Sequence, residues 1–410
     1  MKPTEPWQQA LQVLIKLEHA DKKLNEYLKA FEKKGNNYAA CRAYTLNVVK
    51  HKYLLNYFLE KNLRKATKPF LKAFLRLVAG DLWQRHLENR LETVAPLING
   101  WVDRSKVIFS KPEIKFVNAV LRKLPSFFEE AQNLPLSIRY NMPNWLIERY
   151  QAFYGEANTQ QYLEWNQTPA RVYIRTLRPF EGLVPSQWPQ FYCVKDTNIW
   201  PKVFKQVQQG RAYIQDPMTR IPIEQLELRE GLRVLDLCAA PGGKTIQIAQ
   251  ILKRTGCIVS VDLPEHMKRF LENIRTYPQV HWLAKDILEL TKSDFEGQKL
   301  PVVYDRVLID VPCSNTGVIQ RKPDVIHRLT LKDFSFLPEL QLKLLTQAST
   351  FVKPQGLLVY STCSIDPEEN ERLIASFLKK NSNFSLQKSQ SSLPWEVQHD
   401  GGASFCLRRG

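Results

Sequence analysis

The chain has 410 residues, of which 44% are hydrophobic, and its formal net charge is +17. No apolar run approaches the length of about 18 residues that spans a membrane, and the first residues lack the apolar segment of a signal peptide. The composition therefore predicts a soluble, cytoplasmic protein of two or three domains, and it argues against a membrane-bound or secreted protein.

The seven cysteines are scattered along the chain, and no two have the spacing Cys-x-x-Cys. They are Cys41, Cys193, Cys238, Cys257, Cys313, Cys363 and Cys406. This pattern argues against a zinc site and a disulfide framework, and it suits a reducing compartment. We therefore expect no metal site.

Most of the positive charge lies in the first third of the chain. Residues 1–125 contain 24 Lys and Arg against 11 Asp and Glu, which leaves a surplus of only four positive charges for the remaining residues. A segment of this kind attracts polyanions, of which nucleic acid is the commonest. An acidic membrane surface is the next interpretation, and a solvated lysine-rich face is the third.

The first third also shows helical periodicity with few breakers. Within Tyr44–Leu59, apolar residues recur at spacings of three and four, which is typical of one buried helix face. We expect a helical bundle over residues 1–135, with helices at Trp7–Leu17, Leu24–Phe31, Tyr38–Leu59, Phe70–Leu82 and Lys115–Leu124.

The rest of the chain has mixed structure. Clustered prolines and short β-type runs such as Arg171–Arg175 predict a small α/β connecting domain over residues 136–230. From residue 231 to 410, strand-like runs alternate with helical stretches, which predicts a mostly parallel sheet covered on both faces. The expected strands are Val234–Leu237, Ile258–Val261, Val280–Leu283, Val307–Ile309 and Leu357–Tyr360, and the serine-rich stretch Ser382–Ser392 is expected to be a loop before the last strand.

The stretch "LDLCAAPGGKT" (Leu235–Thr245) ends like a phosphate-binding loop. That loop requires a further glycine at the position of Cys238, so the interpretation as an NTPase fails. What remains is a strand, a glycine turn and a helix that starts at Thr245, which is the first unit of a doubly wound nucleotide-binding sheet. Asp262 ends the second strand, where an acid accepts hydrogen bonds from ribose hydroxyls. We therefore expect a cofactor that contains a ribose.

Ligands of open parallel sheets bind beyond the carboxyl ends of the strands. Asp286 follows the third expected strand, Asp310 and Cys313 follow the fourth in "DVPCSNTG", and Cys363 follows a later strand in "YSTCSIDPEEN". Each has a plainer alternative role, because a cysteine is more often a buried apolar residue and an aspartate a turn or cap residue. Their joint placement with Asp262 at one edge favours a functional site.

Two cysteines beside a nucleoside cofactor and a basic domain suit methylation of a pyrimidine. Carbon 5 of the ring is a poor nucleophile, but a thiolate that adds to carbon 6 makes carbon 5 reactive toward a methyl sulfonium. A second group near the adduct helps to release the product, and an acid near N3 offsets the charge that develops on the ring. Asp310, three residues before Cys313, is suited to the contact with N3.

The segments "LDLCAAPGGKT", "DVPCSNTG" and "YSTCSIDPEENE" resemble those of RNA cytosine-C5 methyltransferases of the Nop/Sun class, and most closely those of its members that act on small-subunit ribosomal RNA. The resemblance covers essentially the whole chain, with "FVNAVLRKL" (116–124), "MPNWLIERY" (142–150) and "AYIQDPMTR" (212–220) upstream. It implies a multi-domain α and α/β protein. Its parts are a NusB-like helical RNA-binding domain (1–135), a small α/β connecting domain (136–230) and a C-terminal Rossmann-like domain (231–410) that uses S-adenosylmethionine.

By position, the resemblance assigns the nucleophile to Cys363 and product release to Cys313. It places Asp262, Asp286 and Asp310 at the S-adenosylmethionine site, with Asp310 also facing the cytosine. The loop of that site consists of Cys238, Ala239, Ala240, Pro241, Gly242, Gly243 and Lys244. Lys244 is expected to contact the cofactor or the base, or to balance charge within the loop. Because the target base must leave its stack, the basic N-terminal domain is expected to position a splayed nucleotide.

The implied reaction methylates carbon 5 of a cytosine in small-subunit (16S) ribosomal RNA, with that RNA as partner and no obligate protein partner. Two alternatives stay open: a tRNA cytosine-C5 methyltransferase and a non-catalytic RNA-binding ribosome assembly factor. The NusB-like start argues against the first. The presence of Cys313, Cys363 and Asp310 argues against the second, because a pure binding module has no need of them.

Overall fold

The computed structural model describes residues 5–18, 23–32, 37–63 and 67–410. Contacts within the chain divide it into two compact units, Met1–Thr168 with Ile319–Arg328, and Pro169–Val318 with Leu329–Gly410. A division into three domains with limits at residues 135 and 230 stays a prediction. In the described part of the chain, no helix is both long and apolar enough to span a membrane.

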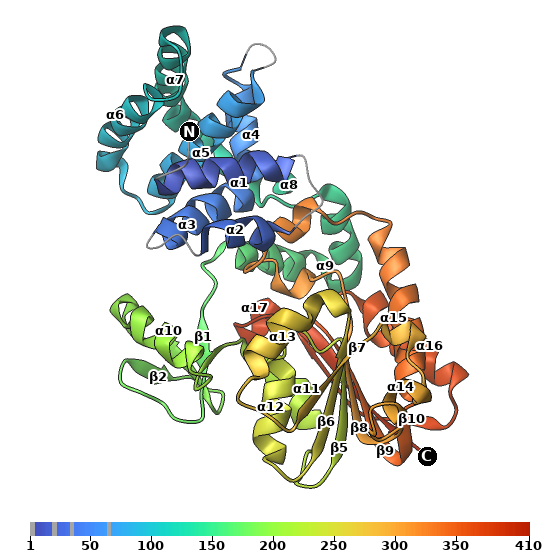
Figure 1. Ribbon diagram of the computed structural model, residues 1–410. Helices are drawn as coiled ribbons and strands as arrows, with labels where there is room; N and C mark the ends of the chain where they lie inside the picture. Colours follow the sequence, from blue (N-terminus) through green and yellow to red (C-terminus); the bar gives the residue numbers. More distant parts are fainter. Residues whose placement is uncertain (1–4, 19–22, 33–36, 64–66) are drawn as a thin grey trace. The chain divides into compact units, whose positions relative to one another are not determined.

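The described part of the first unit is helical. Trp7, Phe74 and Trp101 form an aromatic centre in its core, with their rings edge to face at centroid distances of 5.8–6.1 Å. The helices (Figure 1) are α1 (Pro6–Glu18), α2 (Leu24–Glu32), α3 (Asn37–Lys50), α4 (Lys52–Glu60), α5 (Pro69–Leu87), α6 (Val94–Ser105), α7 (Lys111–Lys123), α8 (Leu136–Arg139) and α9 (Asn144–Gln167). The predicted helical bundle is confirmed.

The prediction of a single helix at Tyr38–Leu59 is wrong, because the structure has two helices, α3 and α4, that are separated at His51. This residue leaves the helical conformation, with φ −118° and ψ 18°, and its buried ring lies 6.2 Å from that of Trp83. A break of one residue does not disturb the apolar spacing on either side, so periodicity alone does not reveal it.

A segment that follows the Cys313 loop belongs to the first unit. It comprises Ile319–Arg328, and His327 donates its Nε2–H to the carbonyl of Val49 at 2.9 Å. Gln320 donates its side-chain amide to the hydroxyl of Thr168 at 2.6 Å. The helical unit is therefore completed by residues from the C-terminal half of the sequence.

The second unit, all of whose residues are described, contains two sheets. The smaller is antiparallel with the order β2-β3-β1-β4, and it is followed by the short helix α11 (Arg220–Gln225). Its elements are β1 (Tyr173–Arg175), β2 (Leu183–Pro185), β3 (Phe191–Val194), α10 (Trp200–Gln208) and β4 (Tyr213–Ile214).

The larger sheet has the strand order β10-β11-β9-β8-β5-β6-β7. The five strands from β9 to β7 are parallel, whereas β11 runs antiparallel to both of its neighbours, β9 and β10. The strands are β5 (Arg233–Leu237), β6 (Cys257–Asp262), β7 (Val280–Ala284), β8 (Tyr304–Asp310), β9 (Val352–Thr362), β10 (Phe384–Ser392) and β11 (Gly402–Arg409). All five strands expected from apolar runs are confirmed.

Helices cover both faces of this sheet (Figure 1). Leu235 and Leu237 face the side of α15 and α16, whereas Val234 faces the side of α12 and α13, as the alternation along a strand requires. These helices and their neighbours are α12 (Gly243–Leu252), α13 (Met267–Ile274), α14 (Lys292–Glu296), α15 (Asp333–Ser349), α16 (Glu371–Lys380) and α17 (Pro394–Val397). The strand order reverses beside β5, so the crevice between the carboxyl ends of β5 and β8 is the place where such sheets bind ligands.

The loop expected at Ser382–Ser392 is wrong, because most of this stretch is the edge strand β10 (Phe384–Ser392). It pairs with β11 from end to end, with a register shift at Gln387, and every side chain between its two end residues is exposed. The strand is held by backbone hydrogen bonds and not by burial of one face. Its sequence therefore needs no alternation of apolar and polar residues, and the strand could not be predicted from such a pattern.

Candidate active site

The turn after β5 is fastened to the end of β6. Cys238 adopts a left-handed conformation (φ 57°), and the N–H of Ala240 donates to Oδ2 of Asp262 at 2.8 Å. Gly242 has φ 100°, and a Cβ at this position would lie only 3.2–3.3 Å from side-chain atoms of Ile274 and Phe270. Glycine is therefore required here by both conformation and space, and the turn has a fixed shape.

Asp262 lies at the carboxyl end of β6 with its carboxylate held in place. Its Oδ1 accepts hydrogen bonds from the N–H of Leu263 and from Nδ1 of His266, both at 2.7 Å. Leu263 beside it is exposed, and so is Leu288 beyond β7. A carboxylate with an exposed apolar side chain beside it fits an adenosine, whose ribose hydroxyls donate hydrogen bonds and whose aromatic base presents apolar faces.

Asp286 is an exposed residue whose Oδ1 accepts the N–H of Leu288 at 2.9 Å. It therefore caps the short 3-10 helix Ile287–Glu289. A contact between Asp286 and the cofactor stays a prediction.

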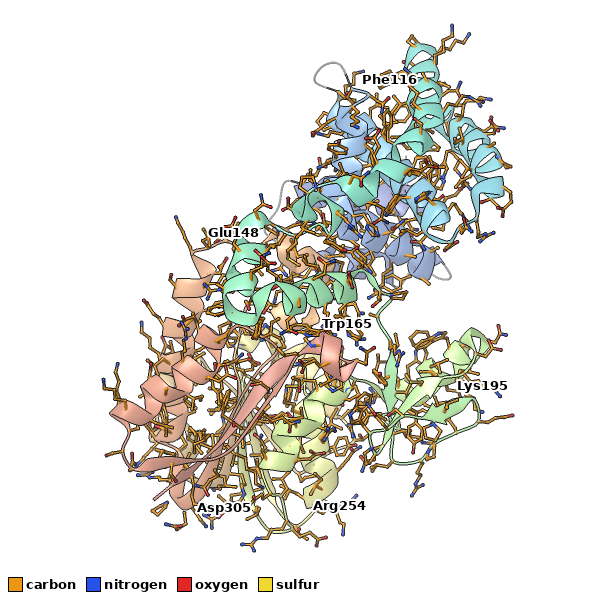
Figure 2. The ribbon with its side chains drawn as sticks, turned by 180° about the vertical axis from the view of Figure 1, so that it is seen from behind. Phe116, Glu148, Trp165, Lys195, Arg254 and Asp305 are labelled. Atoms are coloured by element: carbon orange, nitrogen blue, oxygen red, sulfur yellow. The ribbon has the colours of Figure 1, made fainter. Side chains whose placement is uncertain are left out.

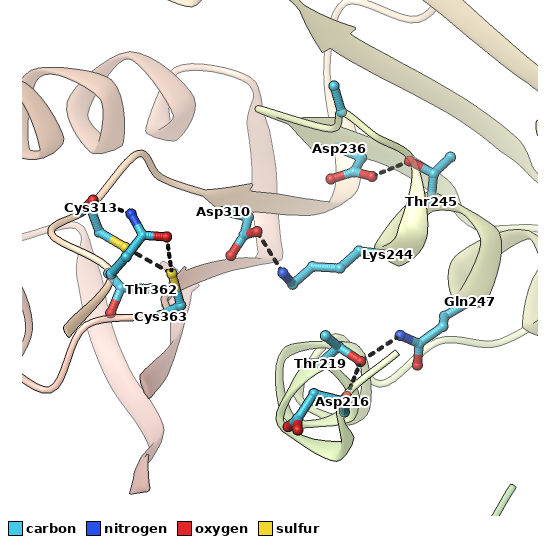
Figure 3. Close-up of polar contacts among 12 residues, drawn as sticks. Asp216, Thr219, Asp236, Lys244, Thr245, Gln247, Asp310, Cys313, Thr362 and Cys363 are labelled. Carbon is cyan, nitrogen blue, oxygen red and sulfur yellow. Dashed lines mark hydrogen bonds and ion pairs between the residues drawn. The ribbon is translucent and has the colours of Figure 1, made fainter. Parts of the chain in front are cut away.

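Lys244 and Asp310 meet across the crevice beside β5. Lys244 lies in the first turn of α12, Asp310 ends β8, and Nζ of the lysine lies 2.5 Å from Oδ2 of the aspartate (Figure 3). Burial opposes the charge of the ammonium group, but the nearby Asp310 carboxylate outweighs it, so the pKa of Lys244 is raised. The lysine is thus a fixed cation that links the glycine turn to the strand before Cys313.

The thiols of Cys313 and Cys363 are adjacent at the same edge of the sheet. Their Sγ atoms lie 3.1 Å apart, and Sγ of Cys363 lies 3.3 Å from Oδ1 of Asn315, to which the thiol can donate (Figure 3). The hydrogen bond to Cys363 and burial both raise the pKa of Cys313 well above its ordinary value. All seven cysteines are described, and none forms a disulfide. Cys313 is therefore a protonated thiol beside a second sulfur.

Asn315 fixes the loop around Cys313. It adopts a left-handed conformation (φ 61°), and its Nδ2 donates to the carbonyl of Cys313 at 2.7 Å. Because its Oδ1 faces Cys363, this one side chain touches both cysteine loops.

Gly317 brings the two loops into direct backbone contact. Its N–H donates to the carbonyl of Cys363 at 3.0 Å, and its own carbonyl accepts the N–H of Gly401 at 2.8 Å. A Cβ at Gly317 would lie 2.4 Å from the carbonyl oxygen of Gly401 and 2.9 Å from that of Cys363. Only glycine allows this approach, so Gly317 sets the distance between the loops.

A buried carboxylate lies beneath both loops. Glu369 is fully buried, and its oxygens accept the N–H of Ser314 at 3.0 Å, the hydroxyl of Ser364 at 2.6 Å and the side-chain amide of Gln341 at 2.7 Å. Burial raises the pKa of Glu369, and the hydrogen bonds oppose that rise. Ser314 and Ser364 each directly follow a cysteine, so one side chain orients both loops.

The chain has recognisable relatives along its whole length. A family model described as 16S rRNA methyltransferase RsmB/F matches residues 223–404, and a NusB family model matches residues 5–125. A protein of Bacillus subtilis (strain 168) named probable ribosomal RNA small subunit methyltransferase B is 30% identical over 431 residues, covering 97% of this chain and 94% of its own length. This chain belongs to the RsmB/F family of methyltransferases. Ribosomal RNA small subunit methyltransferase B of Enterobacter sp. (strain 638) is 32% identical, with 72% of each chain covered.

Solved structures share the fold. The crystal structure of PH0851 superposes with a TM-score of 0.77 at 22% identity, covering 100% of this chain and 99% of its own. NSun6 from Pyrococcus horikoshii with SFG has a TM-score of 0.55 at 20% identity, covering 65% of this chain and 98% of its own. The NusB-like helical domain and the Rossmann-like sheet are thus confirmed, and S-adenosylmethionine is the cofactor of this RsmB/F family methyltransferase.

The structure brings most of the predicted site residues of this RsmB/F chain to one edge of the sheet. The Cys238–Lys244 turn meets Asp262 and Asp310 there, and the pair Cys313 and Cys363 lies at the ends of β8 and β9. Their individual roles stay predictions.

Sequence reasoning missed three residues that shape this edge: Asp236, Asn315 and Glu369. Asp236 is fully buried in β5, its Oδ2 accepts the hydroxyl of Thr245 at 2.5 Å, and its Oδ1 has no partner among the described residues. Burial raises the pKa of Asp236 to about 7. An acid inside the apolar run Val234–Leu237 was the available signal for it, since acids are rarely buried without a purpose.

Proposed function

We propose that this protein transfers the methyl group of S-adenosylmethionine to carbon 5 of a cytosine in small-subunit (16S) ribosomal RNA, through a covalent bond between Cys363 and carbon 6. The observation that supports this most is the pair of thiols 3.1 Å apart, at the edge where the Lys244–Asp310 ion pair also lies. The relatives named ribosomal RNA small subunit methyltransferase B support ribosomal RNA as the substrate.

The first step requires Cys363 as a thiolate, after its proton has passed to water. The neighbouring Cys313 retains its proton because its pKa is raised, so it can donate an S–H hydrogen bond to the thiolate. Attack on carbon 6 then forms the C–S bond and moves an electron pair of the ring toward N3, which takes up a proton from solvent.

Asp310 and Lys244 would stabilise the altered ring. A carboxylate at Asp310 can accept a hydrogen bond from the N3–H that forms during the addition, and the adjacent ammonium of Lys244 lowers the repulsion between that carboxylate and the electron pair that moves toward N3. The two side chains are fixed by each other before substrate arrives, so little reorganisation is needed.

Methyl transfer and release complete the cycle. The cofactor supplies a methyl group on a positively charged sulfur, and carbon 5 takes that methyl group. Loss of the carbon 5 proton to water re-forms the C5–C6 double bond and expels Cys363 as a thiolate, while N3 returns its proton. The Cys313 thiol can donate to the departing thiolate, so its removal should slow release.

The test is to incubate the intact protein with S-adenosylmethionine carrying an isotope-labelled methyl group and either 16S ribosomal RNA or tRNA, and to analyse nucleosides by mass spectrometry. We expect labelled 5-methylcytidine in 16S ribosomal RNA alone. Label in tRNA instead would support the alternative substrate, and no label in any RNA would favour a non-catalytic assembly factor.

A further inference from the structure

The second unit contains a cavity of about 700 Å³ that is separate from the cysteine pair. Its walls are the end of α12, the turn between α13 and β7, and residues beside the small antiparallel sheet. These segments lie at the amino ends of the parallel strands, whereas Asp262 and Asp310 end their strands. Figure 2 shows Arg254 of this cavity at the same edge as Asp305 near the start of β8.

The cavity is strongly basic. Four of its lining residues are cations and none is an acid: Arg178, Arg211, Lys253 and Arg254. Lys253 forms an ion pair with Glu230, but the guanidinium groups of the three arginines have no partner within the described chain. Like charges repel, so three unpaired arginines at one cavity are typical of a site for a polyanion.

The wall behind these cations is rigid. Arg175 is only 1% exposed, and its guanidinium donates to Oε1 of Gln215 at 2.7 Å and to Oε1 of Gln250 at 2.5 Å. Gln250 in turn donates to the hydroxyl of Tyr277 at 2.8 Å, and both residues line the cavity. Nη2 of Arg175 is buried without a partner among the described residues, which adds a further positive charge beneath the cavity floor.

The arrangement fits a chain of phosphates better than one small anion. Arg178 and Arg211 lie on the side of the small sheet, whereas Lys253 and Arg254 lie on the side of α12, so the cations are spread over opposite walls. Gln279 donates its side-chain amide to the carbonyl of Lys253 at 2.7 Å, so its Oε1 can still accept a hydrogen bond from a ribose hydroxyl or a base. Phosphate contacts of this kind position a nucleic acid without reading its sequence.

We propose that this cavity is a second contact site for the RNA substrate, in which Arg178, Arg211 and Arg254 bind backbone phosphates. The six residues of β6 separate the two ends of the sheet, so the bound phosphates lie roughly 20 Å from the reacting cysteines. The proposal rests on the proposed function in that it takes RNA as the ligand.

The test compares two variants of the full chain that each remove three positive charges. R178Q/R211Q/R254Q alters the cavity, and K292Q/K379Q/K380Q alters exposed lysines on other elements. The probe is a fluorescein-labelled single-stranded fragment of 16S ribosomal RNA of about 30 nucleotides, long enough to span both sites. Its binding is followed by fluorescence anisotropy over a range of salt concentrations, with melting temperature and S-adenosylmethionine affinity as checks on the fold.

We expect the cavity variant to bind the RNA at least about tenfold more weakly near physiological salt, and to lower the slope of log affinity against log salt by about two, as loss of three phosphate contacts predicts. The lysine variant should change affinity by less than about twofold, because distant exposed charges are screened. Equal affinities and slopes for the two variants would overturn the proposal. A second result would also overturn the proposal. In it, the unaltered protein binds inorganic pyrophosphate and the cavity variant does not, but both bind the RNA with the same affinity. Fluorescence anisotropy measures RNA binding and does not depend on turnover. If the protein methylates no cytosine, the proposed function is contradicted, but the binding test still decides whether the cavity binds RNA.

Discussion

Glu369 accepts a hydrogen bond at 3.0 Å from the backbone N–H of Ser314, the residue that follows Cys313. Its other carboxylate oxygen accepts the hydroxyl of Ser364, which follows Cys363. A single buried side chain thereby holds the loops of both cysteines, which come from the ends of two neighbouring parallel strands. Such support is what keeps two reactive groups at a fixed separation.

Replacement of Glu369 by Gln should therefore reduce activity without weakening cofactor binding. Both carboxylate oxygens accept hydrogen bonds, and an amide supplies only one acceptor, so a buried donor loses its partner at a cost of about 1–3 kcal/mol. We expect a lower free energy of unfolding in urea and a fall of at least about tenfold in the rate of adduct formation. E368Q is the matched control, because Glu368 pairs with Arg372 at the surface and such pairs contribute little. A normal rate for E369Q would show that the network does not position the cysteines.

The Lys244–Asp310 ion pair predicts non-additive kinetics. K244M should lower single-turnover methylation by about 100-fold, because Asp310 then faces the ring without its cation. D310A should do the same, because it removes the group that accepts the hydrogen bond from N3. The double variant should be little slower than either single variant, since each single substitution already breaks the Lys244–Asp310 ion pair. Strictly multiplicative losses would mean that the two residues act independently.

Gly317 offers a steric test of loop spacing. G317A would place a Cβ 2.4 Å from the carbonyl oxygen of Gly401, so the backbone must move and the two sulfur atoms must separate. We expect loss of most methylation activity and a lower melting temperature. G100A is the control: Gly100 lies in α6 with no atom near its added Cβ, so alanine should raise stability by about 0.5–1 kcal/mol.

Two histidines with lowered pKa values predict acid sensitivity of the helical unit. Burial lowers the pKa of His327 to about 4 and that of His51 to about 3, whereas the unfolded value is 6.5. The unfolded chain therefore binds more protons below pH 6.5, and the free energy of unfolding should fall as the pH drops from 6.5 toward 4, by on the order of 3 kcal/mol for His327.

Denaturant titrations at several pH values test this. H327Q keeps an N–H donor for the carbonyl of Val49 but does not titrate, so it should show a shallower loss of stability between pH 6.5 and 4. H281Q alters an exposed histidine and should leave the slope unchanged. An unaltered slope in H327Q would mean that folding does not lower the pKa of this histidine.

The parallel sheet could be predicted because its strands are buried on both faces. Runs such as Val307–Ile309 are apolar throughout, and the polar residues that follow them, such as Asp310, mark the carboxyl ends. From that alone, Cys313 and Cys363 could be expected at one edge, and the adjacent strands β8 and β9 bring them together.

Other features depend on partners that are distant in the sequence. Glu369 is buried by contacts with Ser314 and Gln341, and nothing in the local run "DPEEN" distinguishes it from Glu368, which pairs with Arg372. The edge strand β10 forms through its backbone pairing with β11, and His51 interrupts a helix whose apolar spacing continues past it. Periodicity reports which face is buried, and it does not report which polar groups meet across the fold.

The roles of the two cysteines can be separated by one measurement. C363A and C313A are each incubated with S-adenosylmethionine and 16S ribosomal RNA, and covalent protein–RNA complexes are resolved on a denaturing gel. We predict that C363A forms no complex and no 5-methylcytosine, whereas C313A accumulates the complex because the leaving thiolate loses its hydrogen-bond donor. A complex trapped by C363A, or none trapped by C313A, would contradict the assignment of Cys363 as the nucleophile and Cys313 as the residue that releases the product.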